Sequence, residues 1–479
     1  MPVTASSSIQ RPPFQQMLGM ELPACPEKPP ARRPALELPA PKLGFRKLSF
    51  GLLETLCPPE LVDRVIKEAG REGERNRLLP PRMVVYALLL MCLSGSMGYG
   101  RLMRGLASQA LRWQPPAGRS AFGKARMRLG SEVMERLFEA LARPLGDPRQ
   151  DADWCFWRGR RVVAIDGTTF PLAVNQELES EFSGQIANDG SRRRVGVPQA
   201  RLLSLIECGS RALLAVALGS YRQGEGSLAR QLANALEPGM LVLADRCFPA
   251  QPLWLLYTAA GADLLWRVKG NLARRHLCEL GDGSYLVNFG KRQPLQIRVI
   301  EYRRPGHPEV YRLITNLLDP VSAPARELAI LYSQRWEIEL ASRELKCDQA
   351  DQGRLRSKTA EGVRQEIYAH CLLHTLNRQL VYSAAASTAE RDPDRISFTL
   401  AMDVLHLSLR HLKTAGRRAR VALKHWAIHQ LIAGDRLVRR ARSCPRAVYR
   451  KLDHFTNRAH WAGAKSTPAP ALSIILRAA

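Results

Sequence analysis

The sequence predicts a mixed α/β protein, with a helical region before the α/β part and a basic helical tail after it. Short apolar runs alternate with helical patterns between residues 161 and 270, which is typical of a sheet covered by helices. Between 271 and 320 the apolar period changes to two, as in half-buried strands. Two of the apolar runs, RVVAIDGTTF and MLVLADRCF, stop at an acid, Asp166 and Asp245.

The N-terminal part divides into two segments. Residues 1–44 are rich in Pro, Ser and Ala, which predicts a disordered arm. Residues 45–150 hold several helical patterns separated by Pro-Pro and Gly breaks, which predicts a small helical domain. Its basic residues fit either a DNA-contacting surface or a helical brace on the next domain; they are Arg101, Arg104, Arg119, Lys124, Arg126 and Arg128.

The central and C-terminal parts follow in order. Residues 151–385 predict three antiparallel strands, two of them joined at Gly209-Ser210, then helix, strand, helix and strand, with later helices covering the sheet. The stretch 271–320 is an expected β-strand insertion, since it separates Asp245 from Glu339. Residues 386–479 predict a basic helical region, because 410–451 carry thirteen Lys or Arg and a single acid.

An Asp at the end of a buried strand places a carboxylate at a sheet edge, where ligands bind in α/β folds. Either Asp alone also fits a turn or a helix cap. A third acid changes this balance. In the helix-like run YSQRWEIELASRELK, the side chains of Tyr332, Arg335, Glu339 and Lys346 fall within about 60° on a helical wheel. A solvated, salt-bridged face is the alternative interpretation.

Three carboxylates from two strands and one helix predict an oxygen-ligand site for Mg²⁺ or Mn²⁺, with room for two ions that promote phosphoryl displacement. Arg335 and Lys346 would then hold phosphates. The net charge of +27 also predicts an acidic partner. We expect nucleic acid and no membrane, because the most apolar stretch, from Met83, is too short to span a bilayer. Without a signal peptide, and with ten Cys in no metal-binding pattern, the chain is expected in the cytoplasm.

The order Asp166, Asp245, Glu339, with the Tyr-x2-Arg-x3-Glu-x6-Lys pattern, resembles the DDE transposases of the insertion sequence 4 type. The resemblance spans roughly residues 45–385 and includes DGTTF, ADRCF, LLWRVKGN and RWEIE. It implies an RNase H-like catalytic core in which Asp166, Asp245 and Glu339 are the catalytic metal ligands. Such a protein cuts double-stranded DNA at the inverted-repeat ends of an insertion sequence and joins the 3′-hydroxyl ends to target DNA.

The resemblance implies further roles. The helical domain would recognise the transposon ends through a helix-turn-helix, and we expect a homodimer in the end complex. Tyr332, Arg335 and Lys346 would bind DNA phosphate, and Trp336 would stack on a base unless it is a core residue. For the rings of the insertion, which are Tyr285, Phe289, Tyr302 and Tyr311, ordinary strand packing is favoured over stacking. Cys247 departs from the family, which more often has Gly there.

Two other functions remain compatible with the sequence. One is a metal-dependent DNA endonuclease on the same fold that performs no strand transfer. The other is a domesticated DNA-binding protein that no longer cuts DNA. The intact triad argues against the second function, because crowded carboxylates without a cation repel one another.

Overall fold

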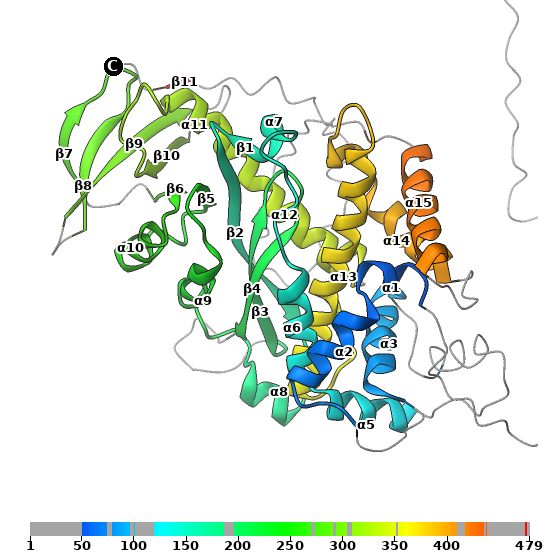
Figure 1. Cartoon of the computed structure of the whole chain (residues 1–479). Helices are drawn as coiled ribbons and strands as arrows, with labels where there is room; N and C mark the ends of the chain where they lie inside the picture. Colours follow the sequence, from blue (N-terminus) through cyan, green and yellow to red (C-terminus); the bar gives the residue numbers. More distant parts are fainter. Residues whose placement is uncertain are drawn as a thin grey trace, which may run out of the picture. The chain divides into compact units, whose positions relative to one another are not determined.

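The computed structural model describes residues 50–73, 79–95, 100, 119–185, 196–269, 274–290, 294–303, 309–350, 353–409, 417–434, 437 and 475–476. The expected arm at 1–44, Arg101, Arg104 and most of the basic tail lie outside the described residues. Contacts group residues 42–479 into one compact unit. The mixed α/β fold class with helical flanking parts is confirmed (Figure 1).

A single mixed sheet forms the centre of this unit. Its strands follow the order β4-β3-β2-β5-β6-β10-β9-β8-β7. Strand β5 is parallel to β2 and to β6, and the remaining neighbours are antiparallel, including the expected β3–β4 pair. The core strands are β2 (Arg160–Pro171), β3 (Gln199–Glu207), β4 (Leu213–Ser220), β5 (Met240–Ala244) and β6 (Asp263–Arg267), and the short β1 (Phe156–Trp157) pairs with β2.

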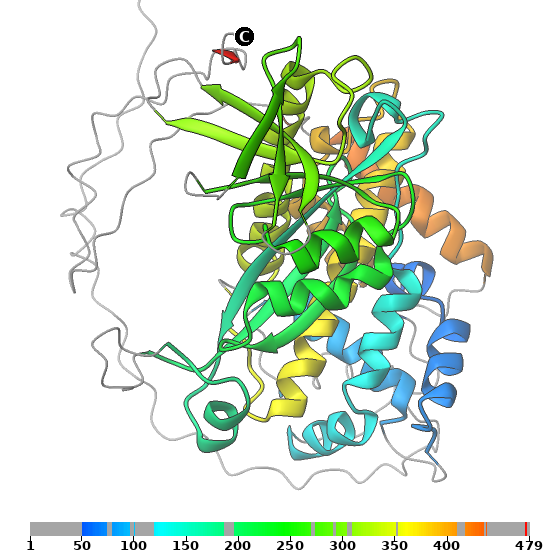
Figure 2. The same cartoon turned by 90° about the vertical axis from the view of Figure 1, so that its left-hand side faces the viewer.

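Alternate residues of β2 enter two different hydrophobic cores. Val163 and Ile165 pack with helices α9 (Glu225–Gln231) and α10 (Gln251–Ala259), together with the 3-10 turn η3 (Leu232–Ala235). Val162 and Ala164 pack on the other face, toward α13 (Ala360–Ala386). Figure 2 shows α9 and α10 in front of the sheet and α13 behind it. The sheet is therefore the middle layer of three.

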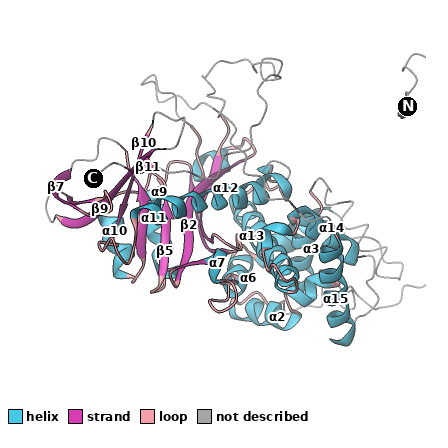
Figure 3. Cartoon of the chain, turned by 90° about the horizontal axis from the view of Figure 1, so that it is seen from above, coloured by secondary structure: helices cyan, strands magenta, loops and turns pink. Residues whose placement is uncertain are grey.

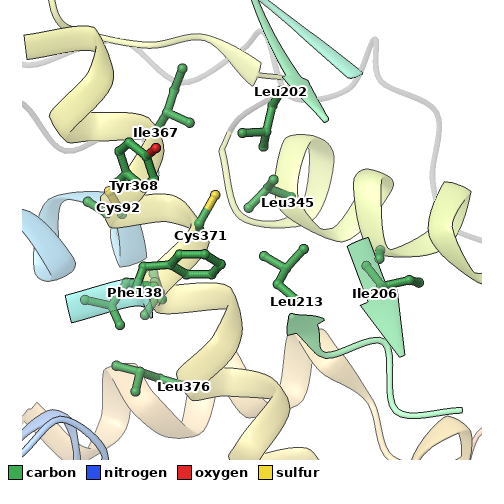
Figure 4. Packing of buried hydrophobic residues seen from close by; sticks show 14 of the residues in the cluster. Cys92, Phe138, Leu202, Ile206, Leu213, Leu345, Ile367, Tyr368, Cys371 and Leu376 are labelled. Carbon is green, nitrogen blue, oxygen red and sulfur yellow. The ribbon is translucent and has the colours of Figure 1, made fainter. Parts of the chain in front are cut away.

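The N-terminal helices pack on α13 and share its hydrophobic core. In Figure 4, Phe138 and Cys92 lie near Tyr368 and Cys371 of α13. Arg126, one of the residues for which a DNA-contacting surface and a helical brace were the two alternatives, is buried and donates to Gln365 and to the carbonyl of Gly362. The helices are α1 (Leu52–Leu56), α2 (Pro59–Glu68), α3 (Pro81–Leu93), α5 (Arg119–Leu129), α6 (Glu132–Leu141), α7 (Ala152–Cys155) and, after β2, α8 (Gln176–Glu181).

The Pro-Pro pairs begin two of these helices. In α2 and α3 the first Pro is extended and the second occupies the first helical turn, where its missing N–H is not needed. Three later elements also pack on α13, and α14 and α15 contact α1 as well; they are η7 (Pro393–Arg395), α14 (Phe398–Ser408) and α15 (Arg417–Ala433). Viewed from above, these helices gather at one end and the strands at the other (Figure 3). No helix among the described residues is long and apolar enough to cross a bilayer.

Four strands between β6 and the next helix extend the sheet, and β10 pairs directly with β6. They are β7 (Arg274–Glu279), β8 (Tyr285–Phe289), β9 (Leu295–Arg303) and β10 (Val310–Thr315), and β11 (Ile475–Leu476) pairs with β9. Buried Arg298 of β9 donates to the Ala323 carbonyl at 2.6 Å, and Asp282 accepts from the Ala325 N–H at 2.8 Å. These bonds hold the start of α11 (Ala325–Leu331) against the extension.

Candidate active site

Asp166 and Asp245 come from neighbouring strands. The β2–β5 pairing ends at Ala164 and Leu243, and β5 itself ends at Ala244. Asp245 therefore follows its strand, as expected. Asp166 does not end its own strand, because β2 continues to Pro171 through pairing with β3. Near Asp166 it is the parallel neighbour β5 that ends. Asp166 and the three residues of β2 that follow it are partly exposed, whereas the four residues before it are buried.

Asp245 is fixed by the turn that follows it. Its Oδ1 accepts a hydrogen bond from the Cys247 N–H at 2.7 Å, which is an Asx-turn. Among the described residues other than Gly, positive φ occurs at Arg158, Ser183, Arg211 and Arg391, and Cys247 is not one of them. The backbone at Cys247 therefore accepts a side chain, which explains how cysteine can stand where the family more often has glycine.

The segment that carries the third acid is helical but not uniform. It starts as a 3-10 turn, η4 (Tyr332–Arg335), continues as α12 (Trp336–Arg343) and ends as a π-helix, η5 (Glu344–Asp348). A wheel with one constant angle per residue therefore only approximates the directions of Tyr332, which lies in the 3-10 turn, and of Lys346, which lies in the π-helical part. Arg335 and Glu339, four residues apart across the start of α12, remain neighbours.

Arg335 joins two of the three acids. Its guanidinium donates to Oε1 of Glu339 at 2.8 Å and lies 3.8 Å from Oδ2 of Asp166. The Arg335 side chain is 15% exposed, so this bridge is partly shielded from water. The strand acid and the helix acid are thus held together by one cation, which places Glu339 next to Asp166.

Burial raises the pKa of Asp166 to about 6, while the Gly167 N–H and Arg335 oppose the shift and the carboxylates of Asp245 and Glu225 add to it. The negative charges of Asp166 and Asp245 therefore act on each other at this sheet edge. A site crowded with carboxylates in this way suits a divalent cation, which would relieve the repulsion and which prefers oxygen ligands.

In this structure the acids are not arranged around an ion. Among the described residues, no three His, Cys, Asp or Glu side chains are grouped so that they could enclose a metal. Glu339 instead directs an oxygen to Arg335. The donor chemistry of the three carboxylates fits a hard cation.

Tyr332, Lys346 and Trp336 differ in their surroundings. Tyr332 is buried, and its hydroxyl donates to the Ala244 carbonyl at 3.1 Å, immediately before Asp245. This contact orients the strand end, and a phosphate contact by Tyr332 stays a prediction. The ammonium of Lys346 lies 6.0 Å above the Phe170 ring. Trp336 is 47% exposed, so it is not a core residue.

The rings of the strand extension are packed. Tyr285, Phe289 and Tyr302 are each 4–5% exposed. Tyr311 stacks on Tyr302 with ring centroids 5.2 Å apart. Ordinary packing, the favoured alternative for these residues, is confirmed for the three buried rings.

Sequence reasoning missed the residue that holds the back of α12. Arg211, in the β3–β4 turn, pairs with Glu337 at 2.7 Å, Glu344 at 3.1 Å and Asp394 at 2.8 Å. Glu344 is buried and also bonded to Arg378 of α13. The side of α12 that carries Glu337, and of η5 that carries Glu344, is therefore an internal ion-pair network and not a solvated face.

Comparison with known proteins agrees with this arrangement. Residues 47–139 match the family described as "Insertion element 4 transposase N-terminal", and residues 157–376 match "Transposase DDE domain". Together these matches cover more than half of the chain. The three acids and Arg335 all fall within the second match.

Two Escherichia coli (strain K12) proteins are similar to the chain. "Transposase InsG for insertion sequence element IS4" is 28% identical over 406 residues, which cover 81% of this chain and 90% of that protein. "Putative transposase InsZ" is 32% identical over 203 residues, which cover 41% of this chain and 66% of that protein. From both family matches and the similarity over 81% of its length, the chain belongs to the DDE transposases of the insertion sequence 4 family.

Proposed function

We propose that this transposase cuts DNA at the inverted-repeat ends of an insertion sequence and joins the freed 3′-hydroxyl ends to target DNA. The observation that carries the proposal is the link from Asp166 through Arg335 to Glu339, beside the strand end that bears Asp245. Two strands and one helix bring three carboxylates and a guanidinium to one sheet edge. Metal-assisted cleavage of a phosphodiester bond uses this combination, in which carboxylates bind the metal ions and a guanidinium binds the phosphate.

Domains of this family generally use divalent metal ions. We infer that Asp166, Asp245 and Glu339 hold Mg²⁺ or Mn²⁺, as two ions that would lower the pKa of the attacking water or hydroxyl and neutralise the leaving oxygen. Arg335, once Glu339 turns to the cation site, has a guanidinium free to bind a phosphate of the reacting strand in a bidentate manner. Lys346 contributes a second positive charge over Phe170.

The DNA would approach over α12 and α5. Exposed Trp336 precedes Glu339 by three residues, so a base displaced from the duplex near the cleaved bond could stack on its indole. Exposed Lys124 of α5 belongs to the segment that we propose recognises transposon ends. We also propose that two copies act together, one on each end, and that the reaction takes place in the bacterial cytoplasm, on the nucleoid.

The decisive experiment supplies the full-length protein with a duplex that carries one transposon end and with a supercoiled target plasmid, in Mg²⁺. Cleavage at the end followed by covalent joining to the plasmid is the expected result. A pre-cut end with a free 3′-hydroxyl tests the second step separately. Cleavage without joining, even of the pre-cut end, would assign the chain to the endonucleases instead. Binding without any cleavage would indicate a DNA-binding protein.

A further inference from the structure

A fourth acid, Glu225, approaches the same sheet edge from the opposite face of the sheet. Glu225 is the first residue of α9. Its side chain fills the space beside Gly167, because a Cβ added at Gly167 would lie 2.6 Å from Oε1 of Glu225. Gly167 is the neighbour of Asp166 in β2. Any larger residue at 167 would therefore displace the Glu225 carboxylate.

The alternation of β2 explains why Glu225 arrives at this position. Val163 and Ile165 belong to the core that contains α9, and side chains two residues apart share a face of a strand. Position 167 therefore faces α9, whereas Asp166 faces α12 and Arg335. Because residue 167 is Gly, a gap beside the strand backbone admits the Glu225 carboxylate next to the position of Asp166.

The charges of the three acids are coupled. Burial raises the pKa of Glu225, Arg201 lowers it, and the carboxylate of Asp245 raises it. Glu225 in turn contributes to the raised pKa of Asp166. Glu225 is thus within electrostatic reach of both strand acids, although it belongs to a different element and lies outside the Asp-Asp-Glu pattern.

We propose that Glu225 supplies a fourth carboxylate to the cation site of this transposase, through the gap left by Gly167. The inference rests on the cation site of the proposed function. Carboxylates from both faces of the sheet would surround an ion more completely than Asp166 and Asp245 alone, and hard cations gain affinity from additional oxygen ligands. The rival role for Glu225 is structural pairing with Arg201, which lies on the neighbouring strand β3.

The test compares binding of Mn²⁺ to the full-length protein without DNA, measured from the electron paramagnetic resonance of free Mn²⁺. Glu225→Gln keeps the shape of the side chain and removes its charge. Gly167→Ala keeps Glu225 and closes the gap. Each variant should weaken Mn²⁺ binding at least about tenfold and raise the Mn²⁺ concentration needed for cleavage. End binding in chelator should equal that of the wild type.

Matched controls come from the same region. Gly226→Ala adds the same methyl group one residue further along α9, where no atom lies within 4 Å of the added Cβ, and should bind Mn²⁺ normally. Circular dichroism and thermal unfolding check that each variant is folded.

Asp245→Asn serves as the reference for the loss of a metal ligand. If Asp245→Asn loses Mn²⁺ and folded Glu225→Gln does not, the fourth carboxylate is refuted and the proposed function stands. If Asp245→Asn also binds Mn²⁺ normally, the cation site itself is refuted.

Discussion

The guanidinium of Arg335 lies 2.8 Å from a carboxylate oxygen of Glu339, one helical turn further along the chain. The same guanidinium is 3.8 Å from Asp166 on the sheet. A single side chain therefore sets the spacing between the acid of α12 and the acid of β2.

Asp166→Asn should abolish cleavage and stabilise the fold. Cleavage should fall by orders of magnitude, because an amide is a poor ligand for a hard cation.

The folded-state pKa of Asp166 is raised from 3.8 to about 6, so its charged carboxylate destabilises the fold as pH rises, and this destabilisation is complete above about pH 6. Removing that charge should raise the free energy of unfolding by roughly 1–3 kcal/mol, measured by urea unfolding at pH 7.5 in the presence of chelator. Exposed Glu237→Gln is the control, and a less stable Asp166→Asn would contradict the argument.

Cleavage should require Mg²⁺ or Mn²⁺. Ca²⁺ should support the end complex but little cutting, because its larger and more variable coordination shell positions a nucleophile poorly. The assay follows end cleavage and gel-shifted complexes in parallel, with each cation and with chelator. Full cleavage in chelator would eliminate the divalent-cation mechanism.

Arg335 should not be replaceable by Lys. Both Arg335→Ala and Arg335→Lys should lower the cleavage rate tenfold or more, since an ammonium cannot contact two acceptors as a guanidinium does. Lys346→Ala should weaken productive end complexes. Arg343→Gln on α12, whose side chain is 67% exposed, controls for loss of positive charge on the same helix. If Arg343→Gln is as defective as Arg335→Lys, general charge and not the bridge explains the effect.

Lys124, exposed on α5, should contribute to binding of transposon ends. Lys124→Glu should weaken binding and reduce the slope of log affinity against log salt by about 1 for a lost phosphate contact. Lys67→Glu, at an exposed position of α2, is the matched charge reversal. Competition titrations with end and scrambled duplexes at two salt concentrations measure both effects. Equal losses for the two variants would remove the special role of α5.

The stability of the fold should fall as pH falls from about 6.5 to 4, partly because of His370. This side chain is 4% exposed, and burial lowers its pKa to about 4. The unfolded chain therefore binds a proton that the folded chain refuses, so the contribution of neutral His370 is complete above about 6.5 and is lost toward pH 4. His370→Asn should reduce this decline by up to roughly 3 kcal/mol. Urea unfolding at pH 7 and pH 4.5 measures it, and an unchanged decline would exclude His370.

The positions of the acids could be predicted from the sequence because local patterns determine them. Strand patterns and helical spacing, which depend on residues close in the chain, predicted that Asp166, Asp245 and Glu339 would lie at one sheet edge, and Arg335 does bridge Asp166 and Glu339. The Arg211 network was not predictable in this way. Its partners come from α12, η5 and η7, and a wheel cannot distinguish a solvated acid from one that meets an arginine of a distant turn. The role of Gly167 likewise depends on α9, more than fifty residues later in the sequence.

Helix α13 supports both the N-terminal helices and the face of the sheet next to α12. The rings of Phe138 and Tyr368 are in contact between α6 and α13, and the Arg126 guanidinium donates a hydrogen bond to Gln365 of α13. The N-terminal helices therefore cannot be exchanged between relatives as an independent module without exposing apolar surface. Because we propose that these helices recognise the transposon ends, new end specificities should arise through substitutions on their outer faces, while their inner faces coevolve with α13.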